Sequence, residues 1–371
     1  MWVAIAAVLQ VSESFFPHPV PGLKFGFANM VTLVIMANYG FKSALKVALL
    51  RTVISSFIIG TFLSPAFIMS FLSALTSTLA MGLLFHISTG RGNGNFSLIG
   101  ISVFGALFHN TTQLLLAYLL LVRHSGIFVF LPWLLIGAVI TGVITGILTR
   151  EITLRLVVSP ASSSREYIKD YPENEESFVI NAFQPGGSFI HKLKPEIKIA
   201  ALIIISFIVL AMENMTLYLI IAAAIVITAV LSDIPPGKLF MGTKKILPLI
   251  IVSFLIPVFF SGFSRGLYKG ILFSLKIIIL SISAALLAAT TSIEKLEDGF
   301  KKLLAKLKLL KIDPDRTAKI ISLSWKWVPE LWKELRCLIR FMRSGQKRSL
   351  KDMTALLADF FVYLFSKETT I

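Results

Sequence analysis

Three strongly polar side chains lie within one helical turn of a long apolar segment. His109 and Gln113 are four residues apart and so share a helix face, with Asn110 beside them. Imidazole and carboxamide groups both donate and accept hydrogen bonds, which suits recognition of a polar small molecule. The alternative is that these groups hydrogen-bond to neighbouring helices and hold a membrane bundle together. Polar side chains inside a bilayer are costly, so we favour a binding role for this cluster.

A second polar group comes from the first two apolar segments. Gln10 and Glu13 have helical spacing in residues 1–16, and Lys24 and Asn29 lead into the next segment. We predict that the 109–113 cluster contacts a substrate and that Glu13, Lys24 and Asn29 form its rim or lid near an outer loop. For Glu13 and Asn29, a packing role is an equally open alternative.

The elements that position these residues are predicted from composition. The chain has 371 residues, of which 56% are hydrophobic and 15% charged, a balance typical of an all-α polytopic membrane protein. Six apolar segments form a predicted first domain in residues 1–150: 1–16, 23–39, 43–60, 65–86, 96–122 and 127–149. Gly142 and Gly146, four residues apart, favour close packing of the sixth segment.

Residues 151–189 are a polar, Pro- and Ser-containing stretch, predicted to be a cytoplasmic linker. Apolar segments resume in the predicted second domain, residues 190–371, at 197–212, 217–231, 246–260 and 267–289. Residues 353–365 are apolar but short, so they are expected to form a final span or an interfacial helix.

The formal net charge of +16 comes from basic residues concentrated outside the apolar segments. This distribution indicates a cytoplasmic N-terminus and contact with anionic lipid, not nucleic acid. On this count Lys42, Lys46 and Arg51 are cytoplasmic, as are Arg91, Arg150 and Arg155. The single Cys337 excludes an internal disulfide and a multi-cysteine metal site, and we expect no metal site.

Two basic amphipathic helices are predicted at 292–310 and 314–345. Residues 301–351 contain fifteen Lys or Arg against four Asp or Glu, interspersed with Leu, Ile and Trp at helical spacing. Thr291 and Glu294 indicate a capping box, and Asp313 with Pro314 indicates a new helix start. Central charges exclude these helices from the bilayer core, so we place them on the cytoplasmic face.

The first domain resembles the Gx transporter family, whose members look like substrate-binding (S) components of energy-coupling factor transporters. The resemblance rests on residues 21–29 (PGLKFGFAN) and 105–113 (GALFHNTTQ). Some members have historically been labelled as component I of heptaprenyl diphosphate synthase. The resemblance implies a six-helix bundle that binds a small vitamin-like molecule, of the flavin or of the quinone or isoprenoid precursor class. In such transporters S components meet their partner through small residues of the first helix, where this chain has Ala4, Ala6 and Ala7.

The second domain resembles the T component of the same transporters. The similar stretches are residues 190–198 (IHKLKPEIK), 290–292 (TTS) and 327–331 (WVPEL). In that family, Ala-Arg-Gly triplets at the ends of two coupling helices dock into cytoplasmic ATPases. The nearest sequence here is Arg343-Ser344-Gly345. The resemblance therefore implies ATPase coupling through Arg340, Arg343, Ser344 and Gly345.

Both resemblances imply a fused S and T protein in a prokaryotic plasma membrane. No Gly-x-x-x-x-Gly-Lys-Ser/Thr phosphate loop occurs, so we expect ATP to be used by separate ATPase subunits and expect no covalently bound cofactor and no enzymatic activity in this chain. A prenyl diphosphate synthase subunit is a weaker alternative, because paired aspartates for Mg²⁺ are missing. A membrane adaptor for redox or lipid-synthesis proteins is the third interpretation.

Overall fold

The computed structural model describes residues 1–14, 26–90, 96–158, 183–235, 237, 239, 246–306, 314–343 and 350–366. Every regular element in these ranges is a helix, which confirms the all-α prediction. Lys24, Asp313, Ser344 and Gly345 lie outside the described residues, as does most of the predicted linker.

The first half of the chain forms a helical bundle. Its elements are α1 (Trp2–Glu13), α2 (Phe27–Tyr39), α3 (Phe41–Ile59), α4 (Pro65–Gly90), α5 (Leu98–Leu116), the π-helix η1 (Ala117–Val122), the 3-10 helix η2 (Ser125–Phe130) and α6 (Leu131–Val158). Gly40 alone separates α2 from α3. Its φ of 80° lies in the region that glycine enters without a steric penalty, so the chain can reverse there in one residue.

The second half contains a hairpin, two long helices and the amphipathic helices. Its elements are α7 (Phe189–Lys192), α8 (Pro195–Ala211), α9 (Met215–Leu231), α11 (Leu247–Phe260), α12 (Phe263–Thr290), α13 (Ile293–Lys306), α14 (Pro314–Arg343) and α15 (Leu350–Ser366). Proline at the first helical position has no amide to leave unsatisfied, and α8 and α14 both begin this way. The predicted start of a helix at Pro314 is confirmed.

Four of the described helical stretches are long and apolar enough to cross a membrane: residues 65–88, 98–122, 125–156 and 263–290. The helices α1, α2, α9 and α11 are apolar but shorter. The helix α3 does not qualify as an apolar span, because Lys42, Lys46 and Arg51 lie within its 19 residues. The chain is therefore a polytopic helical protein whose first half mixes long spans with shorter helices.

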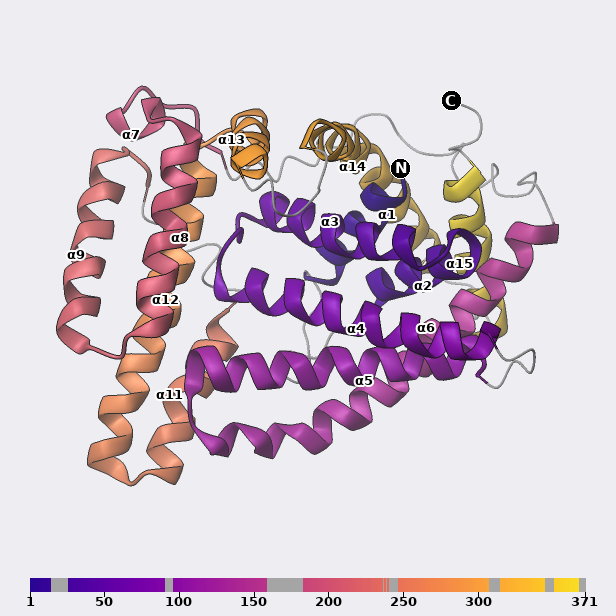
Figure 1. Ribbon diagram of the computed structural model, residues 1–371, viewed down its shortest axis with the longest axis horizontal. Helices are drawn as coiled ribbons and strands as arrows, with labels where there is room; N and C mark the ends of the chain where they lie inside the picture. Colours follow the sequence, from indigo (N-terminus) through magenta and orange to yellow (C-terminus); the bar gives the residue numbers. More distant parts are fainter. Residues whose placement is uncertain are drawn as a thin grey trace.

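The two halves run in different directions. In Figure 1, α3, α4 and α5 lie across the direction of α8, α9 and α12, with α13 and α14 along one side of the molecule. The amphipathic helix α14 packs against α1 and α3, and α15 packs against α6. The helices α14 and α15 of the second half therefore pack directly against the first bundle, and the two halves form one continuous structure.

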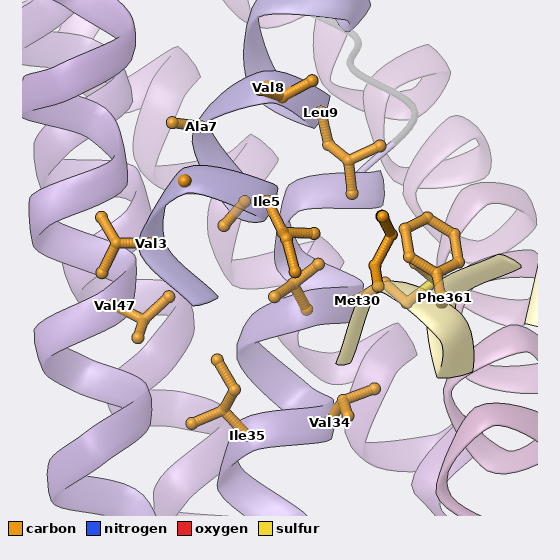
Figure 2. Packing of buried hydrophobic residues seen from close by; sticks show 14 of the residues in the cluster. Val3, Ile5, Ala7, Val8, Leu9, Met30, Val34, Ile35, Val47 and Phe361 are labelled. Carbon is orange, nitrogen blue, oxygen red and sulfur yellow. The ribbon is translucent and has the colours of Figure 1, made fainter. Parts of the chain in front are cut away.

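The largest apolar cluster draws residues from both halves. Ile5 and Leu9 of α1 pack near Met30 of α2 and Phe361 of α15 (Figure 2). The same cluster includes Ile321, Val328, Leu331, Leu335 and Leu338 of α14. Ala4, Ala6 and Ala7 are completely buried, so the first helix presents small side chains where neighbouring backbones approach closely.

The α5–α6 contact depends on the predicted glycines. A Cβ atom on Gly142 would lie 2.6 Å from the Cα of Val103, and one on Gly146 would lie 2.7 Å from the Cα of Ile99. Any larger side chain would push the two helices apart. This close packing places α5 and its polar cluster firmly against α6.

Candidate functional site

Four of the six predicted substrate-binding residues line one cavity in the first bundle. They are Glu13 of α1, Asn29 of α2, and His109 and Asn110 of α5. The cavity encloses about 30 Å³ and also receives residues from α3, α4 and α6. Most lining side chains are polar, and the described lining residues include no Phe, Tyr or Trp. The fold therefore brings two separately predicted clusters together, while their contact with a substrate stays a prediction.

The other two predicted residues are placed differently or not described. Gln113 is buried one turn beyond His109 and does not line the cavity, and its side-chain oxygen has no hydrogen-bond partner among the described residues. Lys24 lies outside the described residues. The shared helix face of His109 and Gln113 was therefore not enough to bring both side chains to the cavity.

Arg51 is the main functional candidate that the sequence interpretation missed. We expected it to be cytoplasmic, but it lies in the interior of α3 with only 3% of its surface exposed, and it lines the cavity. It is buried because α3 packs between other helices of the bundle, so the middle of α3 is protein interior, and the side of the membrane on which Arg51 lies stays a prediction. The missed signal was an arginine well inside a helical segment rather than at its end.

Two amide side chains hold the Arg51 guanidinium. Nη1 donates to Oε1 of Gln10 at 3.2 Å, and Nη2 donates to Oδ1 of Asn29 at 2.5 Å. Nε has no acceptor in the described part of the chain. The guanidinium therefore lies at the junction of α1, α2 and α3 with donor capacity remaining.

Glu13 links the start of α2 to this polar centre. Its Oε1 accepts a hydrogen bond from the backbone amide of Phe27, the first residue of α2. The first amides of a helix have no partner within the helix, and the helix dipole favours a negative charge there. The buried Glu13 carboxylate also lies close enough to Arg51 to interact with its charge. Glu13 thus satisfies a helix end and partly balances the arginine.

Asn110 combines the two roles that the sequence left open. Its Nδ2 donates to the backbone oxygen of Leu134 at 3.1 Å, which ties α5 to α6. It also lines the cavity. Nearby, the hydroxyls of Ser102 and Thr145 are 2.9 Å apart across the same helix pair. Packing and cavity formation are therefore carried out by the same polar groups.

The helix α14 has one buried and one exposed side. Its apolar residues at 321, 328, 331, 335 and 338 belong to the shared core. Lys319, Lys326, Lys333 and Arg340 are exposed and occur every seven residues, so they form one line along the other side. We call these four residues the basic stripe. Arg343 is the last residue of α14, and Ser344 and Gly345 lie outside the described residues.

The helix α13 is anchored where two of the predicted motifs meet. Nζ of Lys198 donates to the backbone oxygen of Thr290 at 2.9 Å and lies 3.2 Å from Oγ1 of Thr291. Lys302 and Glu196 form an ion pair of 2.7 Å, and this hydrogen bond raises the pKa of Lys302. Contacts between the 190–198 motif and the 290–292 motif therefore hold the connection between α12 and α13 in place.

The predicted capping box at Thr291 is wrong by one residue. Thr291 is extended, with φ −134° and ψ 121°, and its hydroxyl contacts Lys198. The carbonyl of Ser292 accepts the first helical hydrogen bond, from Leu296 at 2.9 Å, so Ser292 is the N-cap of α13. The tertiary contact with Lys198 replaces the local one.

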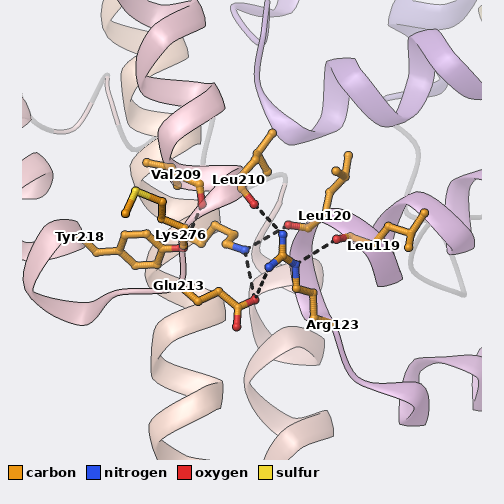
Figure 3. Close-up of polar contacts among 9 residues, drawn as sticks. Leu119, Leu120, Arg123, Val209, Leu210, Glu213, Tyr218 and Lys276 are labelled. Atoms are coloured by element: carbon orange, nitrogen blue, oxygen red, sulfur yellow. Dashed lines mark hydrogen bonds and ion pairs between the residues drawn. The ribbon is translucent and has the colours of Figure 1, made fainter.

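A polar junction joins the two halves at the end of η1 (Figure 3). Arg123 pairs with Glu213 at 3.1 Å and donates to the Leu210 backbone oxygen at 2.8 Å. The fully buried Lys276 of α12 donates to the Leu120 backbone oxygen at 3.3 Å and lies 3.8 Å from Glu213. We call Arg123, Glu213 and Lys276 the junction triad.

The two halves of the chain match two known families. Residues 2–152 match the family described as heptaprenyl diphosphate synthase component I, and residues 186–370 match the family described as cobalt transport protein.

Curated relatives are energy-coupling factor transporter transmembrane proteins (EcfT). The protein of Bacillus subtilis (strain 168) is 26% identical over 213 residues, covering 52% of this chain and 80% of the relative. The one from Ruminiclostridium cellulolyticum is 29% identical over 177 residues, covering 44% and 66%. The Streptococcus thermophilus protein is 29% identical over 169 residues, covering 42% and 64%. These relatives are membrane components of transporters, and each alignment covers about half of this chain.

Proposed function

We propose that this chain unites a substrate-binding and an ATPase-coupling component of an energy-coupling factor transporter in one polypeptide, because its two halves match two different families and its second half is similar to the transmembrane proteins of such transporters. In this proposal the first half binds a small vitamin-like molecule, for which the family resemblance alone suggests the flavin or the quinone or isoprenoid precursor class. Separate ATPase subunits hydrolyse ATP. The protein lies in the plasma membrane with its N-terminus in the cytoplasm.

The observation that carries this proposal is the position of α14 between two surfaces. One side packs on α1, which contributes Glu13 to the cavity, and the other side exposes the basic stripe. A rigid helix in this position transmits a displacement of the stripe directly to the cavity-bearing bundle. The crossed orientation of the two bundles in Figure 1 supports a first half that tips relative to the second.

The proposed ATPase surface combines the end of α14 with the basic stripe. Arg340 and Arg343, followed by Ser344 and Gly345, supply the docking segment implied by the family resemblance. The stripe adds Lys319, Lys326 and Lys333, all exposed and on the same line as Arg340. Basic residues of the cytoplasmic face that the ATPases leave uncovered contact anionic lipid headgroups.

Copurification from native membranes tests this proposal. Tagged wild-type protein should retain two ATPase subunits at stoichiometric yield, identified by mass spectrometry. The double variant Lys326→Glu/Lys333→Glu should reduce that yield by about tenfold or more, because two repulsive contacts replace two attractive ones. The control is Arg265→Glu/Lys269→Glu, which makes the same charge change on exposed residues at the start of α12.

Two results would contradict the proposal. Wild-type protein that retains redox or lipid-synthesis proteins and no ATPase would favour the adaptor interpretation. ATPase yields that fall equally in both double variants would mean that overall charge, and not the stripe, determines binding.

A further inference from the structure

The cavity is lined by a buried cation, Arg51, whose hydrogen bonds to the described residues leave one donor unused. We propose that Arg51 is the residue that anchors the bound molecule, and that this molecule is a small hydrophilic compound with a carboxylate group. The inference rests on the proposed function, because it assigns a ligand class to the substrate-binding half.

The first step is the location of Arg51. It lies near the middle of α3, with 3% of its surface exposed, among helices that form the cavity. A charged side chain in a membrane bundle is expensive to bury and is kept where it has a partner or a role. Packing alone would be served by an apolar residue at this position, as in the rest of the bundle core.

The second step is the count of its donors. A guanidinium has five N–H groups in a planar fork. Here one Nη1 and one Nη2 hydrogen bond go to the amide oxygens of Gln10 and Asn29, and Nε has no acceptor among the described residues. Buried donors are normally satisfied, and the Arg51 side chain lines the cavity, so the unused donor capacity of its guanidinium indicates an acceptor that arrives with a ligand.

The third step is the type of acceptor. The planar fork of arginine matches the two oxygens of a carboxylate, which it binds in a bidentate manner. Glu13 already supplies one negative charge close to Arg51. A diphosphate would add several more negative charges to a pocket wall whose described residues contain one arginine and no lysine. A single carboxylate is the anion that this balance favours.

The fourth step is the character of the remaining wall. Met81 is the largest apolar side chain among the described lining residues, and the rest are mainly hydroxyl, amide or imidazole groups. An isoprenoid tail would find few apolar contacts there. On the α5 side, His109 and Asn110 provide hydrogen-bonding groups for polar parts of the molecule. The wall therefore selects a hydrophilic compound over a lipid-like one.

The test uses the purified full chain in detergent micelles and a metabolite extract of the expression host. Protein is incubated with the extract, desalted and denatured, and the released compounds are identified by mass spectrometry. Wild type should retain a carboxylic acid. Arg51→Gln should retain at least about tenfold less of this acid than wild type. Arg51→Lys should retain an intermediate amount, because lysine keeps the positive charge but lacks the planar fork of donors. The control Arg265→Gln, at an exposed site on α12, should behave as wild type.

A second measurement does not depend on whether the variants fold. The retained acid and its primary amide are titrated separately into wild-type protein, and binding is followed by the thermal shift. The acid should bind about tenfold or more tightly than the amide, because the amide lacks the negative charge and one of the two acceptor oxygens.

The inference is overturned if wild type retains a diphosphate or a compound without a carboxylate, or retains nothing. Equal binding of acid and amide, or equal retention by folded Arg51→Gln, also overturns it. The ATPase copurification experiment shows whether such a result contradicts only the ligand class or also the proposed function. If the ATPases copurify while the Arg51 test fails, the transporter proposal stands and only the ligand class is wrong.

Discussion

Arg51 and Lys276 are both buried basic residues inside helices, but their surroundings differ. Lys276 is completely buried, and its ammonium faces the Leu120 backbone oxygen, the Glu213 carboxylate and the ring of Phe273 at 5.8 Å. Arg51 donates hydrogen bonds to two neutral amides and has the Glu13 carboxylate nearby, but its Nε–H group faces no acceptor in the described structure. One cation is enclosed by partners, and the other borders a cavity.

The difference separates a charge that stabilises the fold from the charge that we propose to bind a ligand. The partners of Lys276 come from both halves of the chain, so its charge stabilises the way in which the halves are docked. The hydrogen-bond partners of Arg51 among the described residues lie in the first bundle, and they leave its Nε donor without an acceptor. A buried charge is therefore informative about function only when its hydrogen bonds are counted.

The largest effect is expected from breaking the junction triad while leaving its buried lysine in place. Glu213→Gln removes the one carboxylate that Lys276 faces among the described residues, and an unpaired buried charge costs about 3–5 kcal/mol. Because Glu213 is 34% exposed, we expect the lower end, about 3 kcal/mol. This loss of stability is measured as the difference in the free energy of unfolding between wild type and Glu213→Gln in mixed detergent micelles.

A matched variant distinguishes this explanation from a general loss of packing. Lys276→Met removes the buried charge together with its need for a partner, so it should cost less than Glu213→Gln. The double variant should recover most of the stability lost in Glu213→Gln. A double variant that is no more stable than Glu213→Gln would show that the charge of Lys276 is not the source of the effect.

A smaller stability effect is expected at Arg51. Arg51→Gln keeps a hydrogen-bonding side chain near Gln10 and Asn29, and Glu13 retains the Phe27 amide, so we expect a loss of about 1–2 kcal/mol. The same unfolding measurement applies. If this variant were less stable than Glu213→Gln, Arg51 would have to be reclassified as a structural residue.

The smallest effect is expected from a third cation at the contact between the halves. Arg155 of α6 pairs with Asp359 of α15 and with Glu151, and its side chain is 30% exposed. Asp359→Asn should therefore cost no more than about 1 kcal/mol, as is usual for solvated ion pairs. A loss of stability close to that of Glu213→Gln would show that solvent exposure does not explain the difference between the Arg155–Asp359 and Lys276–Glu213 ion pairs.

Much of the local structure could be predicted from the sequence. The predicted segments 65–86 and 217–231 correspond to helices Pro65–Gly90 and Met215–Leu231, and the helix start at Pro314 is confirmed. The close contact at Gly142 and Gly146 also follows from their spacing. These features depend on residues within one or two helical turns, where hydrophobicity, proline geometry and side-chain size act directly.

Local pattern was insufficient wherever a partner lies far away in the chain. Arg51 was predicted only as a cytoplasmic cation, because its partners Gln10 and Asn29 lie 41 and 22 residues away in the chain. Thr291 reads as a helix cap until Lys198 is seen to contact it from 93 residues away. Lys276 finds its carbonyl acceptor 156 residues away, in the other half.

The amino-acid sequence by itself therefore determined the helices, their approximate ends, the polar clusters and the basic amphipathic segments of this protein. Only the tertiary structure decided that Glu13, Asn29, Arg51, His109 and Asn110 meet at one cavity, and that Gln113 does not. The physical reason is that helix formation is a short-range property of the chain. Charge compensation and cavity formation depend on which helices pack together, and that is set by the whole core.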